Sequence, residues 1–396
     1  MSTIRRTVGG LRGEGRGWTL LVVSAGWLFV NGFRVVLPAL LPDITSEFTL
    51  TNTGAGFALT VLWVSYAGLQ FPAGVVADRL GERRLLIVGA LLGALSFGAF
   101  YLAPGYSLFL LACVLFGVGA GLFGTPRDML LSRTYPDADS TAYAITFAAG
   151  SLGGAVLPYA ATTVAGQFGW RVAVVWLLPL LLAVTAGLWR VLPPTPPEGE
   201  GASPRATVRA TLGALTDRSV VLAGGALVLA VFTYQALLSF LPTYLIEVKR
   251  LEPGLAAGLY GLVFVLGAAV MPLSGHLADQ YSERATVLAV IALATLTLGA
   301  LPFVDGRLAL AVLVPLLGVR IAVGPLASAF AVRRLPPAVQ GTGWGLLRAT
   351  FFGIGATGST ALGAFADAGL FDAGLLALAG LTAAAGGLWL LIPTAD

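Results

Sequence analysis

The stretch GVVADRLGERR, Gly74–Arg84, places five charges in a short segment of a chain that is only 11% charged. Its charged residues are Asp78, Arg79, Glu82, Arg83 and Arg84. A later stretch, GHLADQYSER, Gly275–Arg284, repeats part of the same pattern. Both stretches separate long apolar segments, so they predict two equivalent charged turns that join apolar helices.

The composition indicates where these helices reside. The chain has 396 residues, of which 57% are hydrophobic, and its mean hydropathy is +0.89. A soluble domain carries about 25% charged residues, so this chain is predicted to be an integral membrane protein. One cysteine, Cys113, and one histidine, His276, are too few for a metal-binding cluster. No nucleophile–base pair is visible either, so we expect no metal, no cofactor and no enzymatic activity.

Twelve apolar segments are long enough to cross the hydrocarbon core of a bilayer, which takes about 20 residues per helix. Their approximate ranges are 18–41, 54–76, 85–103, 107–126, 141–164, 171–191, 219–246, 255–277, 286–304, 308–331, 341–365 and 373–392. One long polar connection, Leu192–Arg218, divides them into two sets of six. We therefore predict an all-α membrane protein with a cytoplasmic tail (1–17), a six-helix bundle (18–191), a cytoplasmic loop (192–218) and a second six-helix bundle (219–396).

The positions of lysine and arginine predict the orientation. Of 23 such residues, sixteen fall in loops on the side of the N-terminus and four in loops on the other side. This places both termini in the cytoplasm and the protein in the plasma membrane, with its cations facing anionic lipid. We accordingly expect no nucleic acid to bind. The basic N-terminal stretch before the first apolar segment favours a retained span over a cleaved signal peptide.

Several residues recur at an offset of 201 positions. Asp78 and Asp279 form one such pair, and the others are Gly74 with Gly275, Gly117 with Gly318, Thr141 with Thr342, and Phe33-Arg34 with Tyr234-Gln235. Independent matches at one offset indicate duplication of a six-span unit. Because six is an even number, the two units share the same topology and are related by an axis along the membrane normal.

The first charged stretch resembles the signature of the major facilitator superfamily. The matching residues are Gly74, Asp78, Arg79, Gly81, Arg83 and Arg84, and Gly275, Asp279 and Arg284 resemble a degraded second copy. The resemblance implies twelve spans and a conformational latch, to which we also assign Arg133, that joins the two halves in the outward-open state. Gly74 would allow close helix approach, and Asp78 would accept hydrogen bonds from a neighbouring helix or arginine. The alternative is that this cluster serves only as a cationic topology anchor.

The region of spans four and five is similar to organic-anion members of this superfamily, namely organophosphate:phosphate antiporters and anion:cation symporters. The similarity rests on Arg127, Tyr135-Pro136, Gly153-Gly154 and Pro158. An arginine that is frequent in span four of proton-coupled drug antiporters would fall near Cys113, where this chain has none. The resemblance therefore favours an organic anion over a drug.

Three arginines fall well inside predicted spans: Arg34, Arg320 and Arg348. A central arginine costs about 2.5–3.5 kcal/mol on the insertion scale, so it rarely faces lipid. The resemblance places all three in helices that line or flank the central cavity, and the cation in span eleven is similar to that of oxalate/formate exchangers. We find no mid-span carboxylate to neutralise them, the nearest being Asp128 and Glu247. Guanidinium binds carboxylate or phosphate through paired hydrogen bonds, although each arginine could instead bind main-chain carbonyls.

The remaining candidate ligand contacts are polar or aromatic residues inside spans. Trp27, Asn31 and Arg34 share one helical face, and Trp344 shares a face with Arg348. The predicted substrate contacts are Arg34, Arg320, Arg348, Asn31, Tyr66, Gln70, Tyr234, Gln235 and Trp344, with Trp63, Tyr143, Tyr159 and Tyr260 as weaker candidates. Aromatic residues at helical spacing also occur as ordinary packing.

These observations predict a monomeric secondary active transporter that moves a small organic anion, a carboxylate or a phosphate ester, by rocker-switch alternating access. It would work as a symporter or antiporter, with a proton or sodium as the coupling ion. One alternative is a proton-coupled efflux pump for amphipathic drugs or lipids, which should have an acidic cavity. A second alternative is a transporter-like sensor or chaperone that binds its ligand without translocating it.

Overall fold

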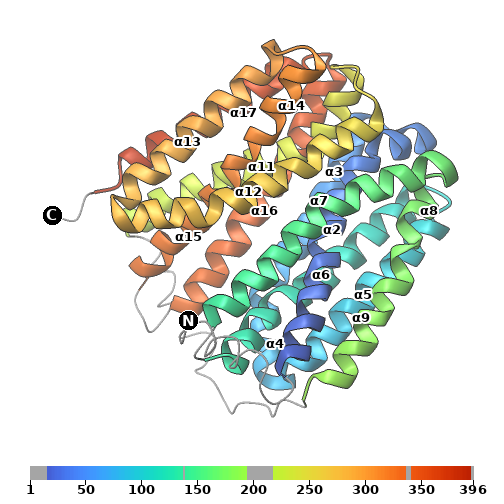
Figure 1. Cartoon of the computed structure of the whole chain (residues 1–396), viewed down its shortest axis with the longest axis vertical. Helices are drawn as coiled ribbons and strands as arrows, with labels where there is room; N and C mark the ends of the chain where they lie inside the picture. The colour runs from blue at the N-terminus through green and yellow to red at the C-terminus, as the bar shows by residue number, and fades with distance from the viewer. Residues whose placement is uncertain (1–15, 137–138, 194–216, 336–339, 394–396) are drawn as a thin grey trace.

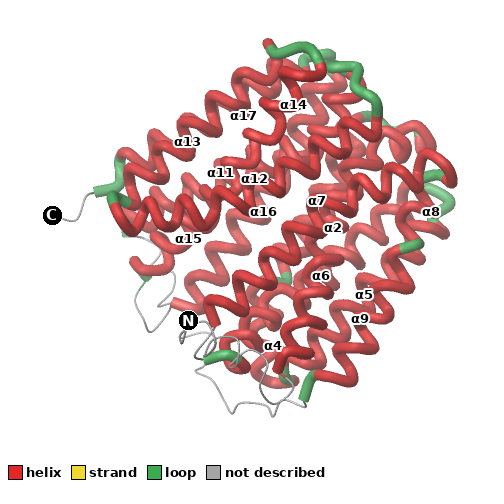
Figure 2. Tube along the Cα trace, viewed as in Figure 1, coloured by secondary structure: helices red, strands yellow, loops and turns green. Residues whose placement is uncertain are grey.

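The computed structural model describes residues 16–136, 139–193, 217–335 and 340–393. Within these ranges the chain is helical, with short turns and no strand (Figure 2). The helices form two groups that correspond to the two predicted bundles (Figure 1). The central loop assigned to 192–218 and the tail assigned to 1–17 lie almost entirely outside the described residues.

The N-terminal group contains six membrane-length units. Its helices are α2 (Arg16–Phe48), α3 (Asn52–Gly68), α4 (Gln70–Leu80), α5 (Glu82–Leu102), α6 (Tyr106–Thr134), α7 (Asp139–Phe168), α8 (Trp170–Val175) and α9 (Leu177–Val191). Helices α3 and α4 together make the second unit, and α8 and α9 the sixth. Gly81 separates α4 from α5 with a φ of 82°, a left-handed conformation that glycine adopts without the penalty of a Cβ. This explains the glycine of the charged stretch.

The C-terminal group repeats the arrangement. Its helices are α11 (Arg218–Glu247), α12 (Pro253–Gln280), α13 (Glu283–Ala300), η2 (Leu301–Phe303), α14 (Arg307–Leu316), η3 (Leu317–Ala322), α15 (Val323–Arg334), α16 (Gln340–Asp367) and α17 (Phe371–Leu390). Helices α14, η3 and α15 form one unit, interrupted by a 3₁₀ segment that follows Pro315. Proline removes a backbone donor, which accounts for the local change of helical type.

Eleven of the twelve units, counted over the described residues, are long and apolar enough to span a membrane. The twelfth is α16, which has 28 residues but carries Arg348 and many glycine, serine and threonine residues. It packs against α3 of the other group and α11 of its own, so protein covers much of its surface. A helix covered in this way needs less apolar side-chain surface than one that faces lipid.

Duplication of the six-helix unit is visible in matched contacts. A Cβ at Gly117 would lie 2.3 Å from the carbonyl oxygen of Leu62, and a Cβ at Gly318 would lie 2.1 Å from that of Val263. Gly318 lies 201 positions after Gly117, and Val263 lies 201 positions after Leu62, which is the predicted offset. The same relation holds for two arginines, because Arg83 donates to the carbonyl of Trp189 and Arg284 to that of Leu390.

The two groups meet most closely at the end opposite the chain termini, which we call the far end. There the Asp367 carboxylate accepts hydrogen bonds from the backbone of Asn52 and Thr53 and from the Thr53 hydroxyl. Thr60 and Thr360 also hydrogen bond across the interface, with 2.8 Å between their hydroxyl oxygens. These contacts close the far end.

Toward the end that carries the termini, which we call the termini end, the groups diverge (Figure 1). Helices α7 and α12 contact each other near mid-height and on the far-end side of it. There Gly154 faces Phe264, and Gly261 faces Ala155. Helix α15 packs only on helices of its own group among the described contacts. The contacts between the groups are therefore concentrated at the far end and at mid-height, and the groups are less closely packed toward the termini end.

The predicted latch residues form contacts within their own groups in this arrangement. Arg83 and Arg284 hold the charged turns against α9 and α17, and Arg133 pairs with the buried Glu82 at 2.6 Å. Close helix approach, expected at Gly74, is not seen at Gly74 or at its counterpart Gly275 in this arrangement. A Cβ would meet only Thr125 at 3.6 Å at Gly74 and nothing within 4 Å at Gly275. The side chain of Asp78 lies outside the described residues, and the latch across the halves stays a prediction.

Candidate functional site

Arg34 lies near the middle of α2 and is buried among aromatic rings. Its guanidinium carbon is 3.9 Å from the ring centroid of Tyr66, 4.8 Å from that of Trp63 and 5.4 Å from that of Trp27. Aromatic faces stabilise a cation by roughly 0.5–2 kcal/mol each but do not accept its hydrogen bonds as a carboxylate does. The Nε and Nη2 atoms of Arg34 are buried without a hydrogen-bond partner. Two donors of this buried cation are therefore unsatisfied within the protein.

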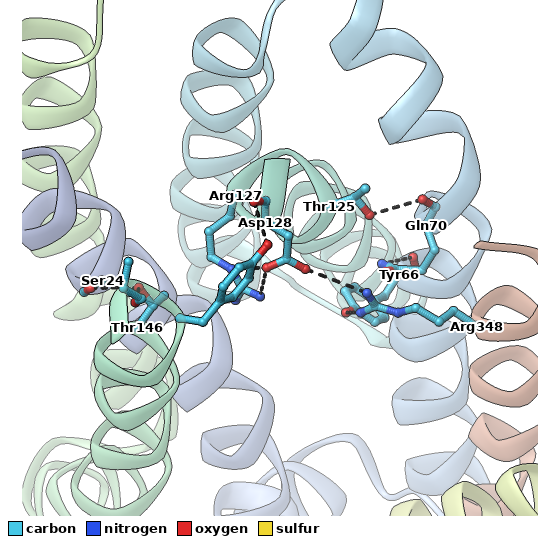
Figure 3. A network of polar contacts seen from close by, with 10 residues as sticks. Ser24, Tyr66, Gln70, Thr125, Arg127, Asp128, Thr146 and Arg348 are labelled. Atoms are coloured by element: carbon cyan, nitrogen blue, oxygen red, sulfur yellow. Dashed lines mark hydrogen bonds and ion pairs between the residues drawn. The ribbon is translucent and has the colours of Figure 1, made fainter. Parts of the chain in front are cut away.

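A second cationic cluster, formed by Arg127, Asp128 and Arg348, reaches Tyr66 (Figure 3). Arg127 of α6 is only 2% exposed, stacks on Trp27 at 3.6 Å and pairs with Asp128 at 2.5 Å. Arg348 of α16 reaches across from the other group, with its Nη1 3.8 Å from the Asp128 carboxylate and its Nη2 3.5 Å from the Tyr66 hydroxyl. Tyr66 thus lies between Arg34 on its ring face and Arg348 at its hydroxyl.

This cluster corrects two expectations from the sequence. Arg127 lies within a helix and is buried, whereas the sequence places it in a solvated loop. Asp128 is close enough to neutralise Arg127 and, in part, Arg348, whereas the sequence indicates arginines without a carboxylate partner. The helix α6 continues to Thr134, well beyond the predicted end of its span at residue 126, and this extension carries both residues into the protein.

A small pocket lies between the two groups at mid-height. It is lined by Asn31, Arg34, Val35 and Pro38 of α2, Trp63 of α3, Tyr234, Gln235, Leu238 and Ser239 of α11, and Tyr260 and Phe264 of α12. Four of the predicted contact residues, namely Asn31, Arg34, Tyr234 and Gln235, come together here.

The other two predicted arginines do not line this pocket. Arg320 is in η3, where its Nη2 donates to the Thr233 hydroxyl at 2.6 Å. Arg348 is in the Asp128 cluster described above. The three guanidinium groups therefore do not share one chamber in this structure, which corrects the expectation of a single site with three cations.

The remaining predicted residues have identifiable surroundings. Gln70 is buried, and its amide nitrogen donates to the carbonyl of Tyr66. The ring of Trp344 packs 5.8 Å from that of Phe351. The hydroxyl of Tyr143 donates to the carbonyl of Asp128, and Tyr159 is exposed. None of these residues lines the pocket, and their assignment to substrate stays a prediction.

Sequence reasoning missed Phe264 and underestimated Trp63 and Tyr260. The repeat contained a signal for Phe264, because the offset of 201 pairs it with Trp63. The same offset pairs Arg34 with Gln235 and Pro38 with Ser239, and all of these residues line the pocket. The pocket therefore lies on the pseudo-twofold axis of the duplication.

The family is decided by a match that spans most of the chain. A family model described as the Major Facilitator Superfamily matches residues 22–360. The chain belongs to the major facilitator superfamily. The superfamily assignment accounts for both the twelve helical units and the charged stretch at Gly74–Arg84.

The relatives of this chain carry names that refer to different substrates. The hexuronate transporter of Bacillus subtilis (strain 168) is 24% identical over 260 residues, covering 63% of this chain and 61% of that protein. The multidrug resistance protein MdtH of Proteus mirabilis (strain HI4320) is 35% identical over 111 residues, covering 27% of this chain and 28% of that protein. This chain thus spans less than two thirds of the length of either relative.

Solved structures of superfamily members share the fold. A point mutant of the nucleoside transporter NupG has a TM-score of 0.80 at 13% identity, covering 95% of this chain and all of that one. A bacterial homologue of the human lysosomal transporter Spinster, in an inward-facing and unoccupied conformation, has a TM-score of 0.79 at 14% identity, covering 96% of this chain and 97% of that one. At these identities the likeness concerns the fold alone.

Proposed function

We propose that this protein is a secondary active transporter of small organic anions, with Arg34 as the main anion-binding residue. The observation that carries the proposal is the pair of buried, unpartnered donors on Arg34 in a pocket between the halves. A guanidinium without a counter-charge in a low-dielectric site attracts an anionic ligand strongly. The hexuronate transporter among its relatives is named for an organic anion, which supports the proposal.

The mechanism follows from the position of the pocket between the two groups. Residues of α2 and α3 form one side of it and residues of α11 and α12 the other. Rocking of the groups would close the termini end and open the far end around a bound ligand. An empty site keeps buried positive charge that opposes closure, whereas a bound anion neutralises it. We propose symport or antiport on this basis, with a proton or sodium as the coupling ion.

The charge distribution of the loops supports cytoplasmic termini and a plasma-membrane location. In that orientation the diverging ends of the two groups would face the cytoplasm. We propose a monomer, because each chain contains both halves of the pocket.

Transport by purified protein in proteoliposomes tests the proposal. We expect counterflow of a radiolabelled organic anion, and we expect Arg34→Gln to raise its KM about ten- to a hundredfold, because a hydrogen bond to a charged group contributes about 1.5–3 kcal/mol. Arg307→Gln is the matched control, since Arg307 is an exposed arginine at the far end. Unchanged anion transport by a folded Arg34→Gln variant would contradict the proposal.

Efflux of amphipathic drugs is the second candidate, favoured by the MdtH relatives. A pump for cationic drugs needs acidic groups in its cavity, whereas the residues that line this pocket include one arginine and no carboxylate. Transport of a cationic dye with no effect of organic anions would favour this candidate. A sensor that binds without translocating would show saturable binding of the anion but no counterflow.

A further inference from the structure

We infer that the ligand is a small aromatic monocarboxylate, an inference that rests on the proposed anion transport. The unsatisfied polar atoms of the pocket are all donors. They are Nε and Nη2 of Arg34 and the amide nitrogen of Gln235, and both side chains are at least nine-tenths buried. A carboxylate is the complementary group, because when ionised it only accepts hydrogen bonds.

Three other polar side chains of the pocket already have partners within the protein. Asn31 donates to the carbonyl of Gly150, and Tyr260 donates to that of Leu238. The Ser239 hydroxyl bonds to that of Ser359 at 2.7 Å. A sugar acid carries a hydroxyl on nearly every carbon, and each hydroxyl buried without a partner opposes binding. The pocket therefore favours a ligand with one polar end.

The walls around the donors are aromatic. Trp63 and Phe264 lie on opposite sides of the pseudo-twofold axis, and Tyr234 and Tyr260 complete the aromatic lining. Phe264 is supported edge-on by Tyr260 at 5.5 Å, and Trp63 stacks on Phe352 at 6.0 Å. Ring faces held in this way stabilise a planar aromatic body by stacking and edge contacts. The carboxylate would then bind Arg34 and Gln235, with the ring between Trp63 and Phe264.

The number of cations in the pocket limits the charge of the ligand. Arg34 is the one charged residue in the lining, and its counterpart at the offset of 201 is the neutral Gln235. A dianion, such as a phosphate ester or a dicarboxylate, would keep one charge unpaired in a buried site. The geometry therefore disfavours dianions in the wild-type protein.

Substitution of Gln235 tests this assignment in proteoliposomes. Wild-type protein should take up benzoate in preference to glucuronate, glycerol 3-phosphate and the uncharged benzamide. Gln235→Arg should reverse the order of preference, because it creates a second cation in the pocket. The KM for benzoate relative to that for glycerol 3-phosphate should rise by at least tenfold.

Phe264→Leu should raise the KM for benzoate at least fivefold. Phe330→Leu should not raise it, because Phe330 packs on Trp389 away from the pocket. Thermal melts of each variant establish that it is folded.

The outcomes separate this inference from the proposed function. Transport of glucuronate or glycerol 3-phosphate rather than benzoate, abolished by Arg34→Gln, overturns the aromatic ligand and leaves anion transport standing. An unchanged order of preference in a folded Gln235→Arg variant also overturns the inference. Transport of benzamide or of cations, with no anion transported, overturns both.

Discussion

At the scale of single residues, the three arginines near Tyr66 have different electrostatic situations. Arg34 is surrounded by rings and keeps free donors, Arg127 is paired with Asp128, and Arg348 approaches the same carboxylate from the other half. Burial of a cation requires compensation. Asp128 supplies it for Arg127, and no carboxylate among the described pocket residues supplies it for Arg34. This difference distinguishes Arg34, which we propose to bind the ligand, from Arg127, which has a structural partner.

Asp128→Asn should destabilise the folded protein. It leaves the guanidinium of Arg127, which is 2% exposed, without its counter-charge, and removing one partner of a buried pair costs about 3 kcal/mol or more. We expect a clear decrease of Tm in detergent, measured by intrinsic fluorescence. The double variant Arg127→Gln with Asp128→Asn should recover much of the loss, because no buried charge is then unpaired.

A double variant no more stable than Asp128→Asn alone would show that the pair is not the source of the destabilisation. Arg171→Gln serves as a control for loss of an ion pair near the surface, since Arg171 pairs with Glu47 at the far end. Such an exposed pair contributes at most about 1 kcal/mol.

At the scale of elements, glycine determines how closely the helices of each half approach. Helix α6 contacts α3 at Gly117, and η3 contacts α12 at Gly318, in both cases against a main-chain carbonyl oxygen. In a membrane, helices associate through close packing and not through a hydrophobic driving force, so small residues at such contacts matter. The matched contacts maintain the same geometry in the two halves.

Gly117→Ala and Gly318→Ala should each lower the Tm by several degrees, because the added Cβ would lie within 2.3 Å of a backbone oxygen and the helices must separate. Gly275→Ala is the matched control. It adds the same methyl group in a helix where nothing lies within 4 Å, so its Tm should not fall. Equal effects at all three positions would mean that helix propensity, and not packing, dominates.

Most of the helical architecture and part of the candidate site could be predicted from the sequence. Hydrophobic length predicts the twelve units, and the offset of 201 predicts the duplication. Arg34 and Gln235 are separated by the same offset, and the structure places both in one pocket. Asp128 could not be assigned in this way, because its role depends on Arg348 reaching across from a helix of the other half, a contact between residues more than 200 positions apart.

At the scale of the whole molecule, the two groups of helices are joined mainly at one end. The far end is closed by contacts of α3 with α16 and of α7 with α12, and the groups diverge toward the termini end (Figure 1). The proposed alternating access requires these far-end contacts to break and new ones to form at the termini end. The strength of the far-end contacts therefore influences how often each state is populated.

Thr60→Cys combined with Thr360→Cys should allow a disulfide that holds the far end closed. Their hydroxyl oxygens are 2.8 Å apart, and the natural cysteine, Cys113, is buried and can be replaced by alanine. Oxidation should abolish counterflow, whereas binding from the open end persists, and a reductant should restore transport. Counterflow that continues in fully oxidised protein would contradict alternating access about this interface.

Asp367→Ala should favour opening of the far end. It removes the acceptor for three donors at the start of α3. Loss of such a cap costs about 1 kcal/mol. A change of that size shifts a two-state equilibrium about fivefold. Spin labels at exposed Tyr101 and Phe303 should report a larger population of long distances in the variant. Asp305→Ala, which removes an exposed carboxylate elsewhere at this end, should leave the distribution unchanged.

The pairing of Arg34 with Gln235 across the duplication has a consequence for the order of ligand release. The cation belongs to α2 and its counterpart, an amide, to α11. When the two groups separate on either side of the membrane, the weaker contact with the amide breaks first, and the charged end of the cargo remains on the first group until water replaces it. Exit to both compartments would then pass through the same intermediate, a cargo held only by the N-terminal helices.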